Sequence, residues 1–227
     1  MAKLRSIKTA NTRIEGAIKH FEANRHLFES FAQALMGYFR NDAALASDTH
    51  FLKYRIKDTD NLRKKLMRKA SDGCVIDASN LFDEITDLAG IRLIHLHTQQ
   101  IRSIHTAISG ILQEQQLELI EAPTANCWDI EYERLFREFG LATRSRESMY
   151  TTIHYVVRAN QKTNVACEIQ VRTLMDEVWG EVSHMVNYPV ASQNGTCQDL
   201  LKVLARLTTG CTRLVDSIFT SHGQSSE

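Results

Sequence analysis

The nine residues Val165-Ala166-Cys167-Glu168-Ile169-Gln170-Val171-Arg172-Thr173 carry the clearest strand pattern in the chain. Polar and apolar side chains alternate from Glu168 onward, which is typical of a β-strand with one buried face. Glu168, Gln170 and Arg172 share the other face, and three hydrogen-bonding groups in a row are costly to bury without partners. A half-solvated sheet edge would explain them too. We interpret the face as the wall of an active site, in which Glu168 accepts a proton from a hydroxyl or binds a metal.

The segments around this strand alternate between strand and helix patterns. Residues 150–158 and 165–171 read as a hairpin across a polar turn at 159–164, and residues 52–56, 91–96 and 117–120 read as further strands. Helical periodicity covers the first ~45 residues, then about 61–69, 81–88, 99–115, 174–187 and 197–219. We expect Pro189 to end the helix before it. Residues 127–146 are rich in charge, fit neither pattern and are predicted to be a mobile segment.

The fold class predicted from this order is α+β, with a mixed sheet of about five strands flanked by helices. Two prolines and no Gly/Ser linker favour a single domain over residues 1–227. We divide it into an N-terminal helical extension (1–48), a catalytic core (49–190) and a C-terminal helix with a polar tail (191–227). Six residues form an apolar seam along the last helix that we expect to serve packing, with an oligomer contact left open: Leu200, Leu204, Leu207, Cys211, Leu214 and Ile218.

Bulk composition excludes several classes of function. Lys+Arg and Asp+Glu each number 27, so the net charge is zero and offers no general attraction to DNA or to a membrane surface. The five cysteines include no Cys-x-x-Cys pair, which argues against a disulfide framework or a zinc site and fits a reducing cytoplasm. No run approaches the ~20 apolar residues that a membrane span needs. The N-terminal residues do not resemble a signal peptide.

Two further groups of residues suit a polyphosphate and its metal. Arg55 and Lys57 share one strand face, and Lys65 follows on the next helix. Cations that converge between a strand and a helix can hold phosphates, although a solvated basic helix is the alternative, and the preferred one for Arg63, Lys64, Arg68 and Lys69. In Asp87-Leu88-Ala89-Gly90-Ile91-Arg92, an Asp before a tight turn can hold Mg²⁺ through oxygen. The Arg that follows it can stack on a base or bind phosphate.

A fourth group lies on the other strand of the hairpin. Tyr150, Thr152 and His154 fall on one strand face. An exposed aromatic ring with hydrogen-bonding neighbours can stack on a base and read its edge, whereas a cross-strand aromatic pair is the structural alternative. Residues 150–154 therefore predict a base-binding surface beside the Glu168 strand.

Taken in order, these groups resemble the synthetase domain of the RelA/SpoT family over about residues 50–190. The family pattern Arg-x-Lys-x-x-x-Ser-x-x-x-Lys is similar to Arg55 through Asn61 to Lys65, and Asp-x-x-Gly-x-Arg matches residues 87–92. The Gly-Tyr-x-Ser-x-His loop is similar to residues 149–154, and Glu-Ile-Gln-Ile-Arg-Thr to residues 168–173. Trp179, His184 and Tyr188 resemble the helix that follows in the family. The ordered set is more specific than any one motif.

The resemblance implies a nucleotidyltransferase-like fold and a stand-alone small alarmone synthetase that moves the β,γ-pyrophosphate of ATP to the ribose 3′-hydroxyl of GTP or GDP. By resemblance, Arg55 and Arg92 sandwich adenine, and Lys57 and Lys65 hold the ATP phosphates. Asp87 and Glu168 serve Mg²⁺, and Glu168 also activates the hydroxyl. Tyr150 stacks on the acceptor base, with His154, Gln170 and Arg172 near its phosphates or edge. A transfer of this kind depends mainly on positioning, metal and cations.

The departures from the family pattern lie mostly on the acceptor side. Met149 stands where the family has glycine, Asn61 and Thr152 replace serines, Ser183 replaces a Glu, and Pro189 replaces a basic residue. These changes leave three alternatives open besides GTP or GDP as acceptor: the 3′ end of a tRNA, an adenine nucleotide, or an inactive nucleotide- or RNA-binding module. The sequence does not determine an antitoxin partner, an allosteric effector or the oligomeric state.

Overall fold

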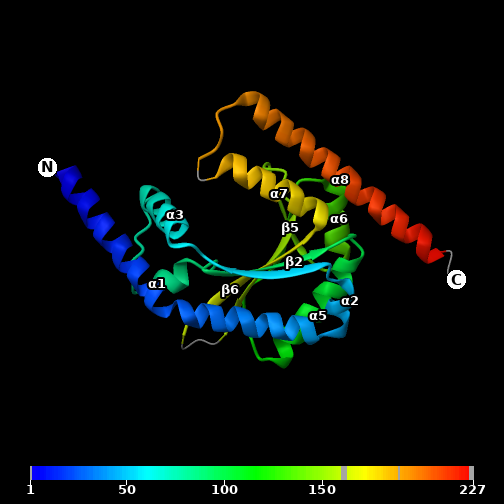
Figure 1. Cartoon of the computed structure of the whole chain (residues 1–227), viewed down its shortest axis with the longest axis horizontal. Coiled ribbons are helices and arrows are strands. Elements are labelled where there is room, and N and C mark those ends of the chain that lie inside the picture. The colour runs from blue at the N-terminus through cyan, green and yellow to red at the C-terminus, as the bar shows by residue number, and fades with distance from the viewer. Residues whose placement is uncertain (1, 160–162, 189, 225–227) are drawn as a thin grey trace.

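The computed structural model describes residues 2–159, 163–188 and 190–224, with side chains described from residue 10 to residue 223 (Figure 1). Within these ranges the structure is built on a six-stranded mixed sheet in the order β1-β2-β6-β5-β3-β4. The strands are β1 Phe51–Ile56, β2 Ala89–His95, β3 Glu118–Cys127, β4 Ala142–Ser145, β5 Thr152–Arg158 and β6 Ala166–Thr173. The predicted fold class is confirmed, with one strand more than expected.

The Glu168 strand lies at the centre of the sheet. β6 pairs antiparallel with β5, as the hairpin pattern predicts, and parallel with β2. This register sets Gly90 beside Glu168 and His154 opposite Gln170. Because side chains alternate across a strand, the polar residues of β2, β5 and β6 come to lie on one face of the sheet.

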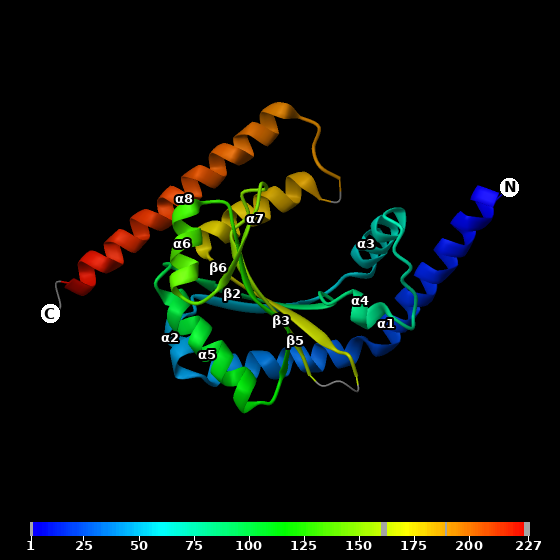
Figure 2. The same ribbon diagram turned by 180° about the vertical axis from the view of Figure 1, so that it is seen from behind.

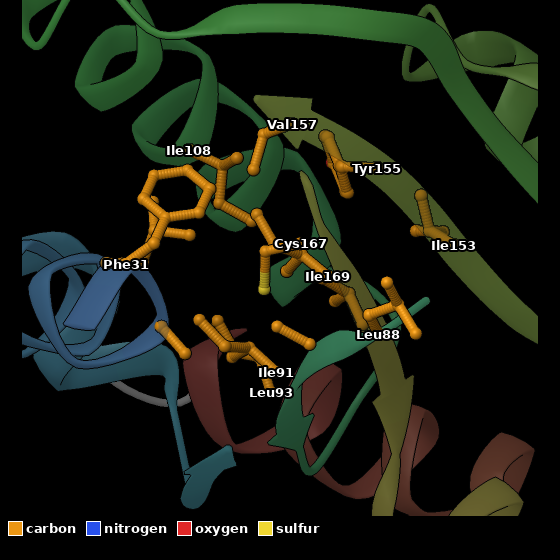
Figure 3. Close-up of a cluster of buried hydrophobic side chains, with 14 of the residues drawn as sticks. Phe31, Leu88, Ile91, Leu93, Ile108, Ile153, Tyr155, Val157, Cys167 and Ile169 are labelled. Atoms are coloured by element: carbon orange, nitrogen blue, oxygen red, sulfur yellow. The ribbon is translucent and has the colours of Figure 1, made fainter. Parts of the chain in front are cut away.

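The opposite face of the sheet is the hydrophobic core. Helices α1 (Ala2–Asn41), α2 (Ala43–Asp48) and α5 (Gln100–Glu114) lie along this face (Figure 2). Phe31 of α1 and Ile108 of α5 meet Ile91, Ile169 and neighbouring apolar side chains from the central strands (Figure 3). All four residues are 8 % exposed or less, so this layer fixes which face of each strand is left for the site.

On the polar face, helices α3 (Thr59–Ser71) and α7 (Leu174–Asn187) lie over opposite ends of the sheet (Figure 1). Each helix follows a strand, α7 directly after β6 and α3 two residues after β1. Asp58 caps α3 by accepting hydrogen bonds from the backbone N–H groups of Asp60 and Asn61. Thr173, the last residue of β6, caps α7 by accepting from the Asp176 N–H at 3.1 Å. The caps therefore set where each helix leaves the sheet.

The remaining helices are α4 (Leu81–Glu84), α6 (Ile130–Glu138) and α8 (Gly195–Gln224). The helix predicted at 81–88 stops at 84, and the residues before β2 form a turn instead. The predicted mobile segment at 127–146 is wrong, because it forms α6 and β4. Asp129 caps α6, whose Tyr132 and Phe136 are buried. Pro189 and part of the 159–164 turn lie outside the described residues.

The apolar seam on α8 does not pack inward as predicted. Leu200, Leu207, Leu214 and Ile218 are 57–62 % exposed. The buried face of α8 instead carries Leu201, Ala205, Thr208, Thr209 and Thr212. This face is anchored to α7 by a hydrogen bond from Trp179 Nε1 to the Leu201 carbonyl at 3.0 Å. None of the helices in the described part of the chain is both long enough and apolar enough to cross a membrane.

Candidate active site

The space between α3 and α7 holds an open cavity of about 670 Å³. Arg55 and Lys57 reach it from β1 and the residue after it, Asp87 from the turn before β2, and His184 and Tyr188 from the end of α7. The α3 side is lined by Asp58, Asn61, Lys64, Lys65 and Arg68. The three cations predicted for phosphate binding are thus brought together, and a volume of this size suits a nucleotide.

Asp87 lies between two of these cations. Its carboxylate accepts from Lys57 Nζ at 2.6 Å and from Lys65 Nζ at 2.8 Å. Burial alone would raise the pKa of Asp87, but the two ammonium groups outweigh it and lower the pKa to about 2. Burial lowers the pKa of Lys57 despite its carboxylate partner. Asp87 is therefore ionised at neutral pH and holds two lysines that would otherwise repel each other.

Glu168 lies on β6 beside Gly90 of β2, close enough to Asp87 of the cavity wall for the two carboxylates to affect each other's charge. Its Oε1 lies 3.1 Å from His154 Nδ1, and its Oε2 accepts from Gln170 Nε2 at 2.6 Å. Burial acts to raise the pKa of Glu168, but the contact with His154 and the hydrogen bond from Gln170 lower it overall. His154 Nε2 is buried without a hydrogen-bond partner among the described residues. The pair thus offers an ionised carboxylate beside a ring nitrogen that a ligand could engage.

The Tyr150 ring is half-buried beside this pair. It is 6.1 Å from the His154 ring, 6.2 Å from Trp179, and 5.8 Å from the Arg172 guanidinium. Burial raises the pKa of the Tyr150 hydroxyl. Thr152 is buried and donates to the Val171 carbonyl at 3.3 Å. Of the residues predicted to form a base-binding face, Thr152 is therefore buried, whereas Tyr150 and His154 are half-buried.

The residue before Tyr150 has an unusual backbone conformation. Met149 has φ +59°, in the left-handed region that favours glycine. This is the position at which the RelA/SpoT pattern has glycine. The departure noted in the sequence is therefore a methionine in a backbone conformation that glycine adopts without strain.

Arg92 and Arg172 are both paired with acidic residues of α7. Arg92 Nη1 donates to Glu177 at 2.9 Å and also to Glu181, and Arg172 Nη2 lies 2.5 Å from Glu177. Arg172 is 3 % exposed at its side chain and Arg92 is 15 % exposed, so neither is a free cation of the open cavity. Arg55, predicted to sandwich adenine with Arg92, has no ion-pair partner in the described ranges.

Sequence reasoning missed several residues that the structure brings to the site. The sequence favours a solvated face for Lys64 and Arg68, yet both line the cavity. Lys64 and Arg68 follow Asn61 by three and seven residues, so all three lie on the same side of the helix. This spacing could have predicted that they line the cavity together. Glu177 and Glu181 carried no signal before the fold was known, because the partner they share, Arg92, lies 85 and 89 residues away along the chain.

The fold is that of the small alarmone synthetases. It matches a GTP pyrophosphokinase family protein from Streptococcus pneumoniae with a TM-score of 0.66 at 17 % identity, covering 91 % of this chain and 94 % of that one. It matches small alarmone synthetase 1 from Bacillus subtilis bound to its product pppGpp with a TM-score of 0.63 at 19 % identity, covering 92 % and 97 %. At these identities the likeness shows the fold alone.

Residues 54–193 match the family model described as "Region found in RelA / SpoT proteins", and the chain belongs to that family. The chain is also similar to GTP pyrophosphokinase YwaC of Bacillus subtilis strain 168, at 25 % identity over 141 residues. That match covers 60 % of this chain and 57 % of the relative, so the chain spans under two thirds of the relative's length. The family match over residues 54–193 contains every residue of the candidate site.

Proposed function

We propose that the chain is a (p)ppGpp synthetase, which transfers the β,γ-pyrophosphate of ATP to the 3′-hydroxyl of GTP or GDP. The observation that carries the proposal is the position of Glu168, an ionised carboxylate that interacts electrostatically with Asp87 of the cation-lined cavity and lies 3.1 Å from His154 beside Tyr150. One side of Glu168 suits a triphosphate and the other suits a base with its ribose. The family membership supports the same division.

The donor ATP fits the 670 Å³ cavity. Its phosphates would take the ammonium groups of Lys57 and Lys65, with Lys64 and Arg68 extending the positive wall along α3. Arg55 would stack on the adenine, because its guanidinium is exposed on the cavity side of β1. Asp87 keeps the two lysines charged and close together before the nucleotide arrives.

The acceptor would lie on the other side of Glu168, with its base against Tyr150. Its 3′-oxygen attacks the β-phosphorus of ATP, the bond from that phosphorus to the α–β bridging oxygen breaks, and AMP leaves. Glu168 accepts the proton of the 3′-hydroxyl through Oε1 or Oε2. His154 and Gln170 orient the carboxylate, and the partnerless Nε2 of His154 is placed to bind the acceptor.

A magnesium ion is part of this proposal, and the residues present fit one. Asp87 and Glu168 are both ionised at neutral pH and are close enough to affect each other's charge. Within the described residues no group of three or more His, Cys, Asp or Glu side chains could hold a metal. Two carboxylates suit Mg²⁺, which completes its shell with water and phosphate oxygens. When bound with ATP, it would neutralise charge on the transferred phosphates.

The test is a transfer assay with γ-labelled ATP, Mg²⁺ and a panel of acceptors: GDP, GTP, AMP, ADP and deacylated tRNA. We expect the label to appear on GDP or GTP, because the γ-phosphate is transferred together with the β-phosphate as one pyrophosphate group. Label on tRNA or on an adenine nucleotide would reassign the acceptor. No transfer to any acceptor would contradict the proposal and favour a binding module.

A further inference from the structure

The carboxylate of Glu177 bridges two arginines on neighbouring strands. Its Oε1 lies 2.9 Å from Arg92 Nη1 on β2, and its Oε2 lies 2.5 Å from Arg172 Nη2 on β6. Glu177 is 13 % exposed at its side chain, so water screens these contacts weakly. Lys53 Nζ approaches the same carboxylate at 3.9 Å from β1. Glu177 is thus the anion around which the cations of three adjacent strands gather.

The two arginines belong to different sides of the proposed site. Arg92 lies on β2, five residues beyond Asp87, and the family resemblance assigns it with Arg55 to the donor adenine. Arg172 lies two residues beyond Gln170 on the acceptor side, with its guanidinium 5.8 Å from the centre of the Tyr150 ring. Two guanidinium groups held this close would repel each other without a shared anion. Loss of that anion would therefore displace both.

Gly180 limits where Arg172 can go. A Cβ at this position would lie 2.6 Å from Arg172 Nη1, so the guanidinium packs directly on the α7 backbone. A side chain 3 % exposed and pressed against a helix has few other positions. Its orientation, and with it the support behind Tyr150, is set by Glu177 one turn earlier on α7.

We infer that Glu177 is a positioning residue that orients both substrate sites at once, through Arg92 for the donor and through Arg172 and Tyr150 for the acceptor. This inference rests on the proposed function for the identity of the two substrates. It predicts that a single change on α7 weakens the binding of both nucleotides, although Glu177 itself touches neither of them.

Glu181 provides a matched control, because it lies one turn further along α7 and contacts Arg92 but not Arg172. It is also more exposed, at 42 %. We expect Glu177→Gln to weaken binding of a non-hydrolysable ATP analogue and of GDP by about tenfold each, as for the loss of a buried charged hydrogen bond. Glu181→Gln should weaken the analogue by about twofold and leave GDP unchanged. Calorimetry measures the dissociation constants of the ATP analogue and of GDP. In a separate transfer assay of Glu177→Gln, we expect kcat to fall by a smaller factor than KM rises.

Two outcomes would overturn the inference: Glu177→Gln affecting one nucleotide alone, or Glu181→Gln affecting both equally. If Glu177→Gln does not fold, Glu177→Asp keeps the charge but is one methylene too short to span both arginines. That variant should lose affinity for at least one nucleotide, and wild-type affinity for both would refute the bridge. Binding is measured apart from transfer, so a wild-type chain that binds both nucleotides without transferring pyrophosphate refutes the proposed function alone.

Discussion

Replacing Asp87 by asparagine tests the charge arrangement at the base of the cavity. The change keeps the size of the side chain and removes the negative charge that holds Lys57 and Lys65 at 2.6 and 2.8 Å. The two ammonium groups would then face each other across a neutral amide. Lys57 is 12 % exposed at its side chain, and burial already lowers its pKa. We expect that pKa to fall further in the variant.

The lowered pKa of Asp87 sets the size of the stability loss expected for Asp87→Asn. Its fall from the ordinary 3.8 to about 2 corresponds to about 2 kcal/mol of folding free energy, at about 1.36 kcal/mol for each pKa unit. Because the folded-state pKa is the lower one, this stabilisation is fully present above pH 3.8 and is lost as the pH falls through 2. Asp87→Asn should therefore lower the free energy of unfolding by about 2 kcal/mol at pH 7, or roughly 4–8 °C in Tm.

Urea unfolding of both chains at pH 7, 5 and 3.5 measures this difference, with Glu114→Gln as a control for an exposed carboxylate of α5. The difference should be constant between pH 7 and 5 and narrow only below about pH 4. Affinity for an ATP analogue should fall in the same variant, because the lysines lose their positioning. A variant within about 0.5 kcal/mol of wild type at pH 7 would refute the reasoning, since the carboxylate would then contribute no net stability.

Three further predictions concern the chemistry and the acceptor. Glu168→Gln should abolish pyrophosphate transfer while thermal unfolding stays within a few degrees of wild type, because the amide keeps the contact geometry and cannot accept the proton; full activity would exclude Glu168 as the base. Tyr150→Ala should raise the KM of the acceptor roughly tenfold or more with little change for ATP, as for the loss of one stacking surface; equal effects on both substrates would exclude the stacking role. Gly180→Ala should raise the acceptor KM at least several-fold, because the new Cβ would meet Arg172 Nη1 at 2.6 Å; Gly110→Ala, on the open surface of α5, is the control and should leave both KM values unchanged.

The strands that build the site could be predicted from the sequence because each carries a local pattern. The alternation around Glu168 and around Arg55 depends only on the period of a β-strand, so the faces of β6 were predicted correctly. On β1 the prediction holds for Leu52 and Ile56, which are half-buried, but Tyr54 of the same face is exposed. The helix at 174–187 was also predicted with its observed bounds. Its cap, Thr173, directly follows the strand pattern.

The errors have one physical cause, which is that burial depends on what packs against a segment. Residues 127–146 look polar because α6 covers the end of the sheet with only a narrow apolar stripe, including Tyr132 and Phe136. The leucine seam of α8 has the right spacing for a buried stripe, yet α7 packs on the adjacent stripe that contains Leu201 and Ala205. A helix with two apolar stripes does not reveal from its sequence which one is covered.

The pairing of charges was equally hidden, and it changes how the arginines of the site are understood. The sequence assigned Arg92 and Arg172 directly to nucleotides, as isolated cations. In the structure both arginines form ion pairs with Glu177. The exposed Arg55 and the α3 cations Lys64 and Arg68 line the open cavity instead. A paired guanidinium can still stack through its flat face, because the carboxylate occupies only its edge. The acidic residues of α7 therefore orient the arginines and still leave their flat faces free to stack on a base. The cations on the cavity wall supply the positive charge that a triphosphate needs.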